Sequence, residues 1–127
     1  MSHSAFSDPH RIQYFEVIGR VDGTNTVSLF ETLDKAIANG FTQLILDLNG
    51  VVYINSAGLR ELVMIFKRVQ QKGGMLHIAN PSDYVKTVLE LVGLDTLFEI
   101  HTNFSLDLLN LSRDNGSILH PQICYLS

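Results

Sequence analysis

The sequence has one cysteine, no long apolar run and no block of like charge, and each absence excludes a class of protein. Cys124 has no second cysteine with which to form an internal disulfide, and one thiol argues against a thiolate metal site. No apolar run approaches the roughly 20 residues that span a bilayer, and the first residues lack the apolar core of a signal peptide. We therefore expect a soluble protein of the cytoplasm, without a membrane partner.

Charge and histidine spacing remove two further classes. Nine basic and thirteen acidic residues leave a formal net charge of −4, so the basic face of a general nucleic-acid binder is missing. The five histidines are scattered, and no two of them have the spacing of metal ligands. We expect no nucleic acid, no metal and no cofactor.

Length and composition fit one compact domain. The chain has 127 residues, of which 46% are hydrophobic, so it can bury a core. Residues 1–10 are rich in Ser and His and read as a flexible arm. We expect a single domain over 11–112 and a tail over 113–127 that has no clear period.

Strand and helix patterns alternate along this domain. Residues 12–21 are rich in β-branched and aromatic residues and predict a strand, 22–26 predict a loop, and 27–40 predict a helix. The nearly all-apolar segment 42–48 predicts a central strand that is covered on both faces.

The second half continues the alternation. Apolar residues at helical spacing predict a helix from residue 56 to 72, with an inward stripe of Leu59, Leu62, Val63, Phe66 and Val69. Strands are expected over 75–79 and 97–100. A helix is expected to begin with Asn80 as N-cap, and a last one to cover 103–112. The chain is therefore predicted to be an α/β domain with a largely parallel or mixed sheet of four to five strands and about four helices, packed mainly on one face.

The stretch "YINSAGLR" places small residues between the central strand and the longest helix. A serine at such a point can cap the helix, act as a nucleophile or accept a phosphate. Ser56 lies near the carboxyl end of a strand, where functional loops of α/β sheets tend to lie.

Several stretches together resemble the STAS domain, a family that includes anti-sigma-factor antagonists and the tails of sulphate transporters. They are "GRVDGTNT", "LILDLNGVVYINSAGLREL" and "KGGMLHIANPSDYVKTVLELVGLDTLFEI", and the resemblance runs from about residue 12 to 111. The helix-start turn and the later "GLDTLFEI" occur in the family's order and spacing.

The resemblance implies a phosphorylation switch without catalysis. Ser56 stands where antagonist members accept a phosphate, and the family's Gly-x-[LIV]-Asp turn falls at Gly19 and Asp22. The resemblance implies that the unphosphorylated domain binds a serine kinase of the histidine-kinase ATPase fold, which is also the anti-sigma factor. It further implies that phosphorylation blocks this binding and that a PP2C-like phosphatase restores it. We expect the domain to be a monomer or weak dimer. The expected partner-binding residues are Asp22, Thr24, Asn25, Asn55, Ala57, Gly58 and Arg60.

Three positions depart from the family's pattern. Asn55 replaces the acidic residue before the acceptor, Ala57 replaces a serine or threonine, and Arg60 replaces a small residue. The main alternative is therefore a STAS scaffold that is not phosphorylated and regulates another signalling protein. A hydrolase is the rival from another class, but the G-x-S-x-G pattern is missing around Ser56. We expect no enzyme activity and no catalytic residue.

Overall fold

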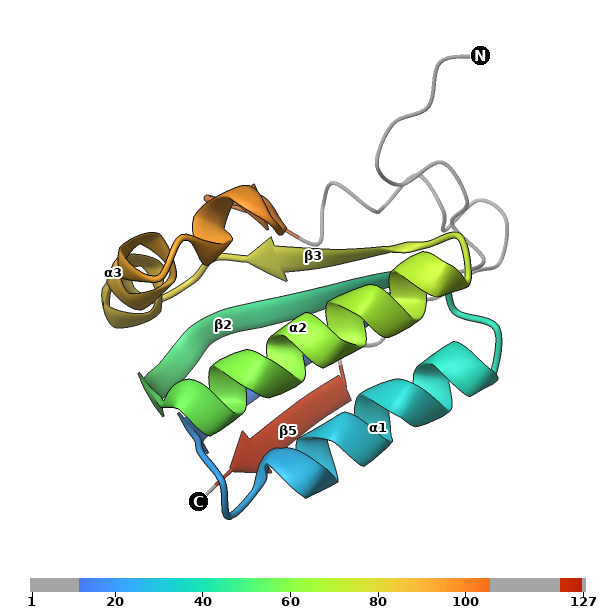
Figure 1. Cartoon of the computed structure of the whole chain (residues 1–127), viewed down its shortest axis with the longest axis horizontal. Coiled ribbons are helices and arrows are strands. Elements are labelled where there is room, and N and C mark those ends of the chain that lie inside the picture. Colours follow the sequence, from blue (N-terminus) through green and yellow to red (C-terminus); the bar gives the residue numbers. More distant parts are fainter. Residues whose placement is uncertain (1–11, 106–121, 127) are drawn as a thin grey trace.

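The computed structural model describes residues 12–105 and 122–126, with strands and helices alternating along the chain (Figure 1). The elements are β1 (Ile12–Val21), α1 (Thr26–Ala38), β2 (Gln43–Ile54), α2 (Ser56–Gln71), β3 (Met75–Ala79), α3 (Asp83–Leu91), the 3-10 helix η2 (Leu94–Thr96), β4 (Glu99–His101) and β5 (Gln122–Leu126). The predicted arm over 1–10 lies outside the described residues.

The five strands form one sheet in the order β4-β3-β2-β1-β5, and all four strand pairings are parallel. The α/β fold is confirmed, and of the two sheet arrangements that the sequence left open, largely parallel or mixed, the structure has the parallel one. The reason is that α1 and α2 each carry the chain back to the amino end of the sheet, so the next strand runs the same way.

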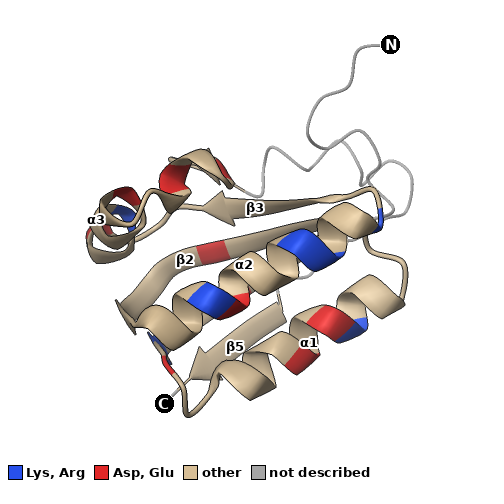
Figure 2. Ribbon diagram, in the orientation of Figure 1, with Lys and Arg blue, Asp and Glu red and all other residues tan. Residues whose placement is uncertain are grey.

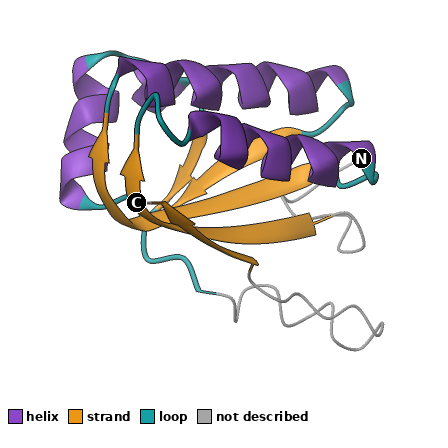
Figure 3. Ribbon diagram, turned by 90° about the horizontal axis from the view of Figure 1, so that it is seen from below, coloured by secondary structure: helices purple, strands orange, loops and turns teal. Residues whose placement is uncertain are grey.

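The helices cover one face of the sheet, as predicted (Figure 3). The described residues contain three α-helices and η2. A fourth α-helix was predicted over 103–112, but residues 103–105 are not helical and 106–112 lie outside the described residues.

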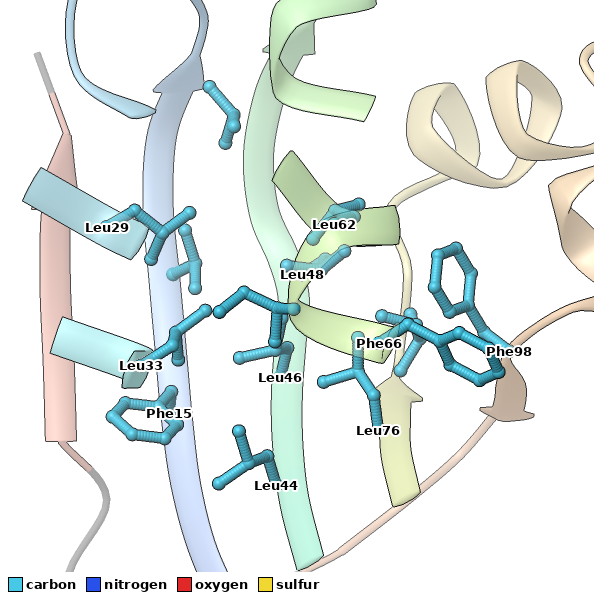
Figure 4. Packing of buried hydrophobic residues seen from close by; sticks show 14 of the residues in the cluster. Phe15, Leu29, Leu33, Leu44, Leu46, Leu48, Leu62, Phe66, Leu76 and Phe98 are labelled. Carbon is cyan, nitrogen blue, oxygen red and sulfur yellow. The ribbon is translucent and has the colours of Figure 1, made fainter. Parts of the chain in front are cut away.

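The main core lies between the helices and the sheet (Figure 4). Leu29 and Leu33 of α1 and Leu62 and Phe66 of α2 point into it, against strand residues such as Leu46. The predicted stripe of α2 is confirmed: Leu62, Phe66 and Val69 are buried, and Leu59 and Val63 are partly buried against them. Each fully buried side chain of this size stabilises the fold by roughly 1.5–3 kcal/mol relative to exposure.

A smaller cluster lies on the helix-free face of the sheet. Ile12, Tyr14, Ile45 and Ala79 extend from β1, β2 and β3, and Phe104 packs onto them with its ring centroid 5.8 Å from that of Tyr14. β2 is therefore covered on both faces at its amino half, as its apolar sequence predicted.

The start of α3 differs from the prediction. Its N-cap is Ser82, whose hydroxyl accepts from the Val85 N–H at 3.3 Å. Asn80 has a φ of 49°, and its side chain hydrogen-bonds the backbone of Phe104 instead. The amide of Asn80 thus closes the β4 loop and cannot cap the helix.

The C-terminal region, for which the sequence suggested no structure, contributes β5. Gln122–Leu126 pairs with β1 in parallel, from Phe15↔Gln122 to Gly19↔Leu126. Cys124 and Leu126 pack against the main core, whereas Ile123 and Tyr125 are exposed. This segment completes one edge of the sheet.

Each of α1, α2 and α3 carries both acidic and basic residues (Figure 2). In the part of the chain that the structure describes, no helix is both long and apolar enough to cross a membrane.

Candidate functional site

The turn between β2 and α2 presents Ser56 to solvent. Asn55 has an extended backbone, and its side chain accepts a hydrogen bond from the Gly58 N–H at 3.1 Å, so Asn55 is the N-cap of α2. Ser56 is the first helical residue and is exposed. Its hydroxyl makes no hydrogen bond to any of the described residues, because Asn55 already performs the capping.

Gly58 brings this turn against the end of β1. A Cβ at Gly58 would lie 2.6 Å from the backbone oxygen of Val21 and 2.8 Å from a side-chain carbon of Ile54. The Asn55 N–H also donates to the Val21 oxygen at 3.2 Å. Gly58 is therefore buried by its own chain and offers a partner no side chain, so its contribution to the predicted surface is the close approach of α2 and β1.

The loop after β1 is closed by its own polar groups. The Asp22 carboxylate accepts from the Thr24 N–H at 3.0 Å and from the Thr24 hydroxyl at 2.6 Å. These bonds, followed by the nearby Arg20 guanidinium, lower the pKa of Asp22 below its usual value. The Asn25 amide accepts from the Asp22 N–H at 3.0 Å and donates to the Arg20 oxygen at 2.6 Å.

The loop and the turn adjoin each other. A Cβ on Gly23 would be 3.8 Å from the Cβ of Ala57, an ordinary van der Waals contact. The structure thus brings Asp22, Thr24 and Asn25 to one side of the Ser56 turn. Arg60 is exposed one helical turn after Ser56, and it forms no ion pair within the described ranges.

Three residues beside this turn were not singled out by the sequence analysis as a group. The guanidinium of Arg20 lies 4.1 Å from the centre of the Tyr53 ring, and Tyr53 stacks on Tyr84 with centroids 6.4 Å apart. They come from β1, β2 and α3, and Arg20↔Tyr53 is a cross-strand pair. No sequence spacing links them, because only the sheet register and the position of α3 bring them together.

A catalytic serine would need a base, and His77 and His101, the two histidines among the described residues, contact each other and not Ser56. Both ring nitrogens of His77 are engaged, Nδ1 with His101 Nε2 at 3.1 Å and Nε2 with Gln43 Oε1 at 2.7 Å. His77 pairs with Ile45 near the start of β2, whereas Ser56 follows the end of that strand, roughly 30 Å away at the usual rise of a strand. A hollow of about 570 Å³ lies beside Asp47 and Asn80, but none of the predicted site residues lines it.

Metal chemistry finds no support here either. Across residues 12–105 and 122–126, no group of three or more His, Cys, Asp or Glu side chains could hold a metal ion.

The site is an exposed serine on a helix start, next to an ordered polar loop, and it defines a small α/β domain that presents a surface turn at the carboxyl end of its sheet.

The comparisons with known proteins agree with this class. The sequence pattern of the STAS domain matches residues 7–106. A protein of Bordetella bronchiseptica named as an anti-sigma factor antagonist, BtrV, is 30% identical over 82 residues, which are 65% of this chain and 71% of that protein.

Solved structures share the fold. SpoIIAA of Bacillus in its phosphorylated form superposes with a TM-score of 0.65 at 16% identity, covering 82% of this chain and 93% of that one. A sulfate transporter family protein of Wolinella succinogenes gives a TM-score of 0.67 at 18% identity, covering 81% and 88% of the two chains. None of the three names describes an enzyme.

This chain belongs to the STAS domain family, and it is an anti-sigma-factor-antagonist-like member. The resemblance that the sequence motifs indicated is confirmed.

Proposed function

We propose that this protein is a phosphorylation switch in the manner of an anti-sigma-factor antagonist. Unphosphorylated, it binds a serine kinase that also acts as an anti-sigma factor, and phosphorylation of Ser56 releases it. The observation that carries the proposal is the exposed Ser56 hydroxyl, unused by its own cap and placed beside the closed 22–25 loop.

The position of Ser56 lets a phosphate be added without unfolding the domain. A phosphoserine brings about −1.5 to −2 charges, and the N-terminus of a helix is favourable to an anion. α2 is a helix of 16 residues that starts at this serine. The added charge then acts on a partner that covers the turn.

The energetic scale is sufficient for a switch. Burying an unpaired phosphate under a partner would cost several kcal/mol. A loss of about 4 kcal/mol corresponds to a thousandfold change in affinity. A single phosphorylation can therefore exchange a bound partner for a free one.

Asn55 in place of an acidic residue is compatible with this proposal. Its side-chain oxygen is engaged by the Gly58 N–H, so the cap of α2 does not depend on a carboxylate. An amide also carries no charge that would repel a phosphate on the next residue.

The proposed partners follow from the same family. They are a serine kinase of the histidine-kinase ATPase fold and a PP2C-like phosphatase that removes the phosphate, both acting in the cytoplasm. Asp22, Thr24, Asn25, Ala57 and Arg60 surround the turn on which the kinase would dock.

A scaffold that is never phosphorylated is the second candidate. Asn55 and Ala57, where the family's pattern has an acidic residue and a serine or threonine, favour it. The two candidates differ in whether Ser56 is modified.

Intact-mass spectrometry of the protein from its native host separates the two. The switch requires a species heavier by about 80 Da, the mass of a phosphoryl group, mapped to Ser56. Its absence under every growth condition tested would leave the scaffold.

Titration calorimetry with the purified kinase tests the mechanism. Ser56→Glu adds one negative charge and should weaken binding, though less than the phosphate does. Ser56→Ala should bind as the wild type does and resist phosphorylation, and Asp22→Ala should weaken binding without unfolding.

The matched control is Gln70→Glu, which adds the same charge about 21 Å away at the other end of α2. It should leave binding unchanged. Equal binding by the wild type, Ser56→Glu and the phosphorylated protein would show that charge at this turn is not the switch.

A further inference from the structure

Arg20 occupies an unusual position beside the Ser56 turn. Its side chain is 52% exposed, yet its guanidinium carbon lies over the Tyr53 ring, 4.1 Å from the ring centre. Tyr53 in turn stacks on Tyr84. An exposed arginine without such support would sample many rotamers, so this stack fixes the direction of the guanidinium.

The far end of the stack is anchored to the sheet. The Tyr84 hydroxyl lies 3.1 Å from the Ile54 oxygen and 3.5 Å from the Ile54 nitrogen. Ile54 directly precedes Asn55, so the stack is attached to the strand end that leads into the Ser56 turn. Arg20 is tied to the same turn through its neighbour Val21, whose oxygen accepts from the Asn55 N–H.

Arg20 and Tyr53 lie on the side of β1 and β2 that faces α3, because Tyr53 stacks on Tyr84 of that helix. Their neighbours Val21 and Ile54 are both buried in the main core under the helices. The stack itself joins the ends of β1 and β2 to the start of α3. The stack therefore extends the surface around Ser56 beyond the 22–25 loop and α2.

The guanidinium keeps donors for a partner. Its nearest acidic group is Asp22, with Nε 3.7 Å from Oδ2, and the opposite oxygen of Asp22 already accepts two bonds from Thr24. The guanidinium carries five N–H donors, and this one contact with Asp22 leaves most of them for a partner. A planar fork of this kind matches a carboxylate in bidentate geometry.

We propose that Arg20, held by the Tyr53–Tyr84 stack, docks a carboxylate side chain of the kinase beside the Ser56 turn. The inference rests on the proposed function, whose partner it describes more closely. It also explains why phosphorylation would weaken kinase binding, because a phosphate on Ser56 repels an acidic group that docks next to it. Arginine and tyrosine are the residue types that most often dominate binding energies at interfaces.

The test is calorimetric titration of the unphosphorylated protein with the kinase that phosphorylates Ser56. Arg20→Gln should weaken binding about tenfold or more, a loss typical of an interfacial arginine. Arg20→Lys keeps the charge but loses the planar fork, so its affinity should lie between those of the wild type and Arg20→Gln. Arg20→Glu should bind more weakly than Arg20→Gln, because it places a carboxylate against the partner's carboxylate.

Two controls separate docking from indirect effects. Lys72→Ala removes one positive charge at the opposite end of α2 and should bind as the wild type does. The loss caused by Arg20→Gln should persist in an Asp22→Asn background, whereas it would vanish if Arg20 acted only by holding Asp22. Unchanged thermal midpoints of the Arg20 variants confirm that the fold is intact.

A double-mutant cycle tests whether negative charge on Ser56 weakens binding by repelling a carboxylate that is bound to Arg20. If the phosphate repels a carboxylate on Arg20, Ser56→Glu should weaken binding less in the Arg20→Gln background than in the wild type. Wild-type affinity in both Arg20→Gln and Arg20→Glu would overturn the docking role and leave the proposed function standing. No binding by the wild type itself would overturn the proposed function and this inference with it.

Discussion

The hydroxyl of Tyr14 on β1 donates a 2.5 Å hydrogen bond to the carboxylate of Asp47 on β2. Both residues are buried, and the second oxygen of Asp47 accepts from the Asn49 N–H at 2.9 Å. Burial and this bond raise the pKa of Tyr14 well above its usual value. The carboxylate of Asp47 thus has hydrogen-bond donors for both of its oxygens within the sheet.

Tyr14→Phe tests this relationship. The change keeps the ring in the small cluster but leaves the buried Asp47 carboxylate with one donor fewer. The free energy of unfolding should therefore fall by about 1–3 kcal/mol. Tyr125→Phe is the control, since Tyr125 is 75% exposed, and it should change stability by less than about 0.5 kcal/mol. Chemical denaturation of both variants gives the comparison.

The orientation of α2 is tested by Leu62→Ala. Leu62 is 2% exposed and packs in the main core, so its truncation should lower the free energy of unfolding by roughly 2–5 kcal/mol. Met64, two residues on and 46% exposed, provides the control Met64→Ala, with an expected loss of about 0.5 kcal/mol or less. Equal losses in the two variants would contradict the assigned face of the helix.

Gly58→Ala tests the close approach of α2 to β1. The new methyl group would lie 2.6 Å from the Val21 oxygen, so the helix start must shift at a cost of about 1–3 kcal/mol. Gly23→Ala adds a methyl group at an ordinary contact distance on the adjoining loop and should cost less. If thermal denaturation gives the same midpoint for both variants, the close approach of the Gly58 backbone to β1 does not determine stability.

Stability should also fall in acid because of His77. Burial, and then the neighbouring His101, lower the pKa of His77 from 6.5 to about 4. Between these two values His77 is protonated in the unfolded chain but not in the folded one. Stability is therefore lost as the pH falls from about 6.5 to about 4. The loss is on the order of 3 kcal/mol.

The contribution of His77 is isolated by comparison with His77→Gln. Urea denaturation of both proteins across this pH range gives two stability curves, and the wild-type curve should fall more steeply. Parallel curves would assign the acid sensitivity to other groups.

Local patterns predicted the fold well where each element carries its own period. The stripe of α2 and the strands at 12–21 and 75–79 could be read from neighbouring residues alone. Asn80 was wrong as a cap because its amide bonds Phe104, 24 residues away, which no local pattern reports. β5 was missed for a similar reason: its five residues form a strand through pairing with β1 and have little pattern of their own.

In the candidate site, too, features set by neighbouring residues could be predicted, whereas those set by long-range contacts could not. Asn55, Ser56 and Gly58 are adjacent in the sequence, and their turn could be recognised from it. The sequence suggested Ser56 as a possible cap of α2, and the structure assigns the cap to Asn55. The Arg20–Tyr53–Tyr84 stack depends on strand register and on the packing of α3, so it required the structure.

The parallel pairing of β5 with β1 has a consequence for the order of events in folding. Phe15 pairs with Gln122, so this ladder closes a loop of more than a hundred residues, whereas Ile12↔Gln43 closes one of about thirty. The longer loop costs about 1 kcal/mol more in chain entropy, and β5 has only one neighbouring strand to offset it. β5 should therefore join the sheet late and open first, and its amides should exchange with solvent deuterium ahead of those in β2 and β3.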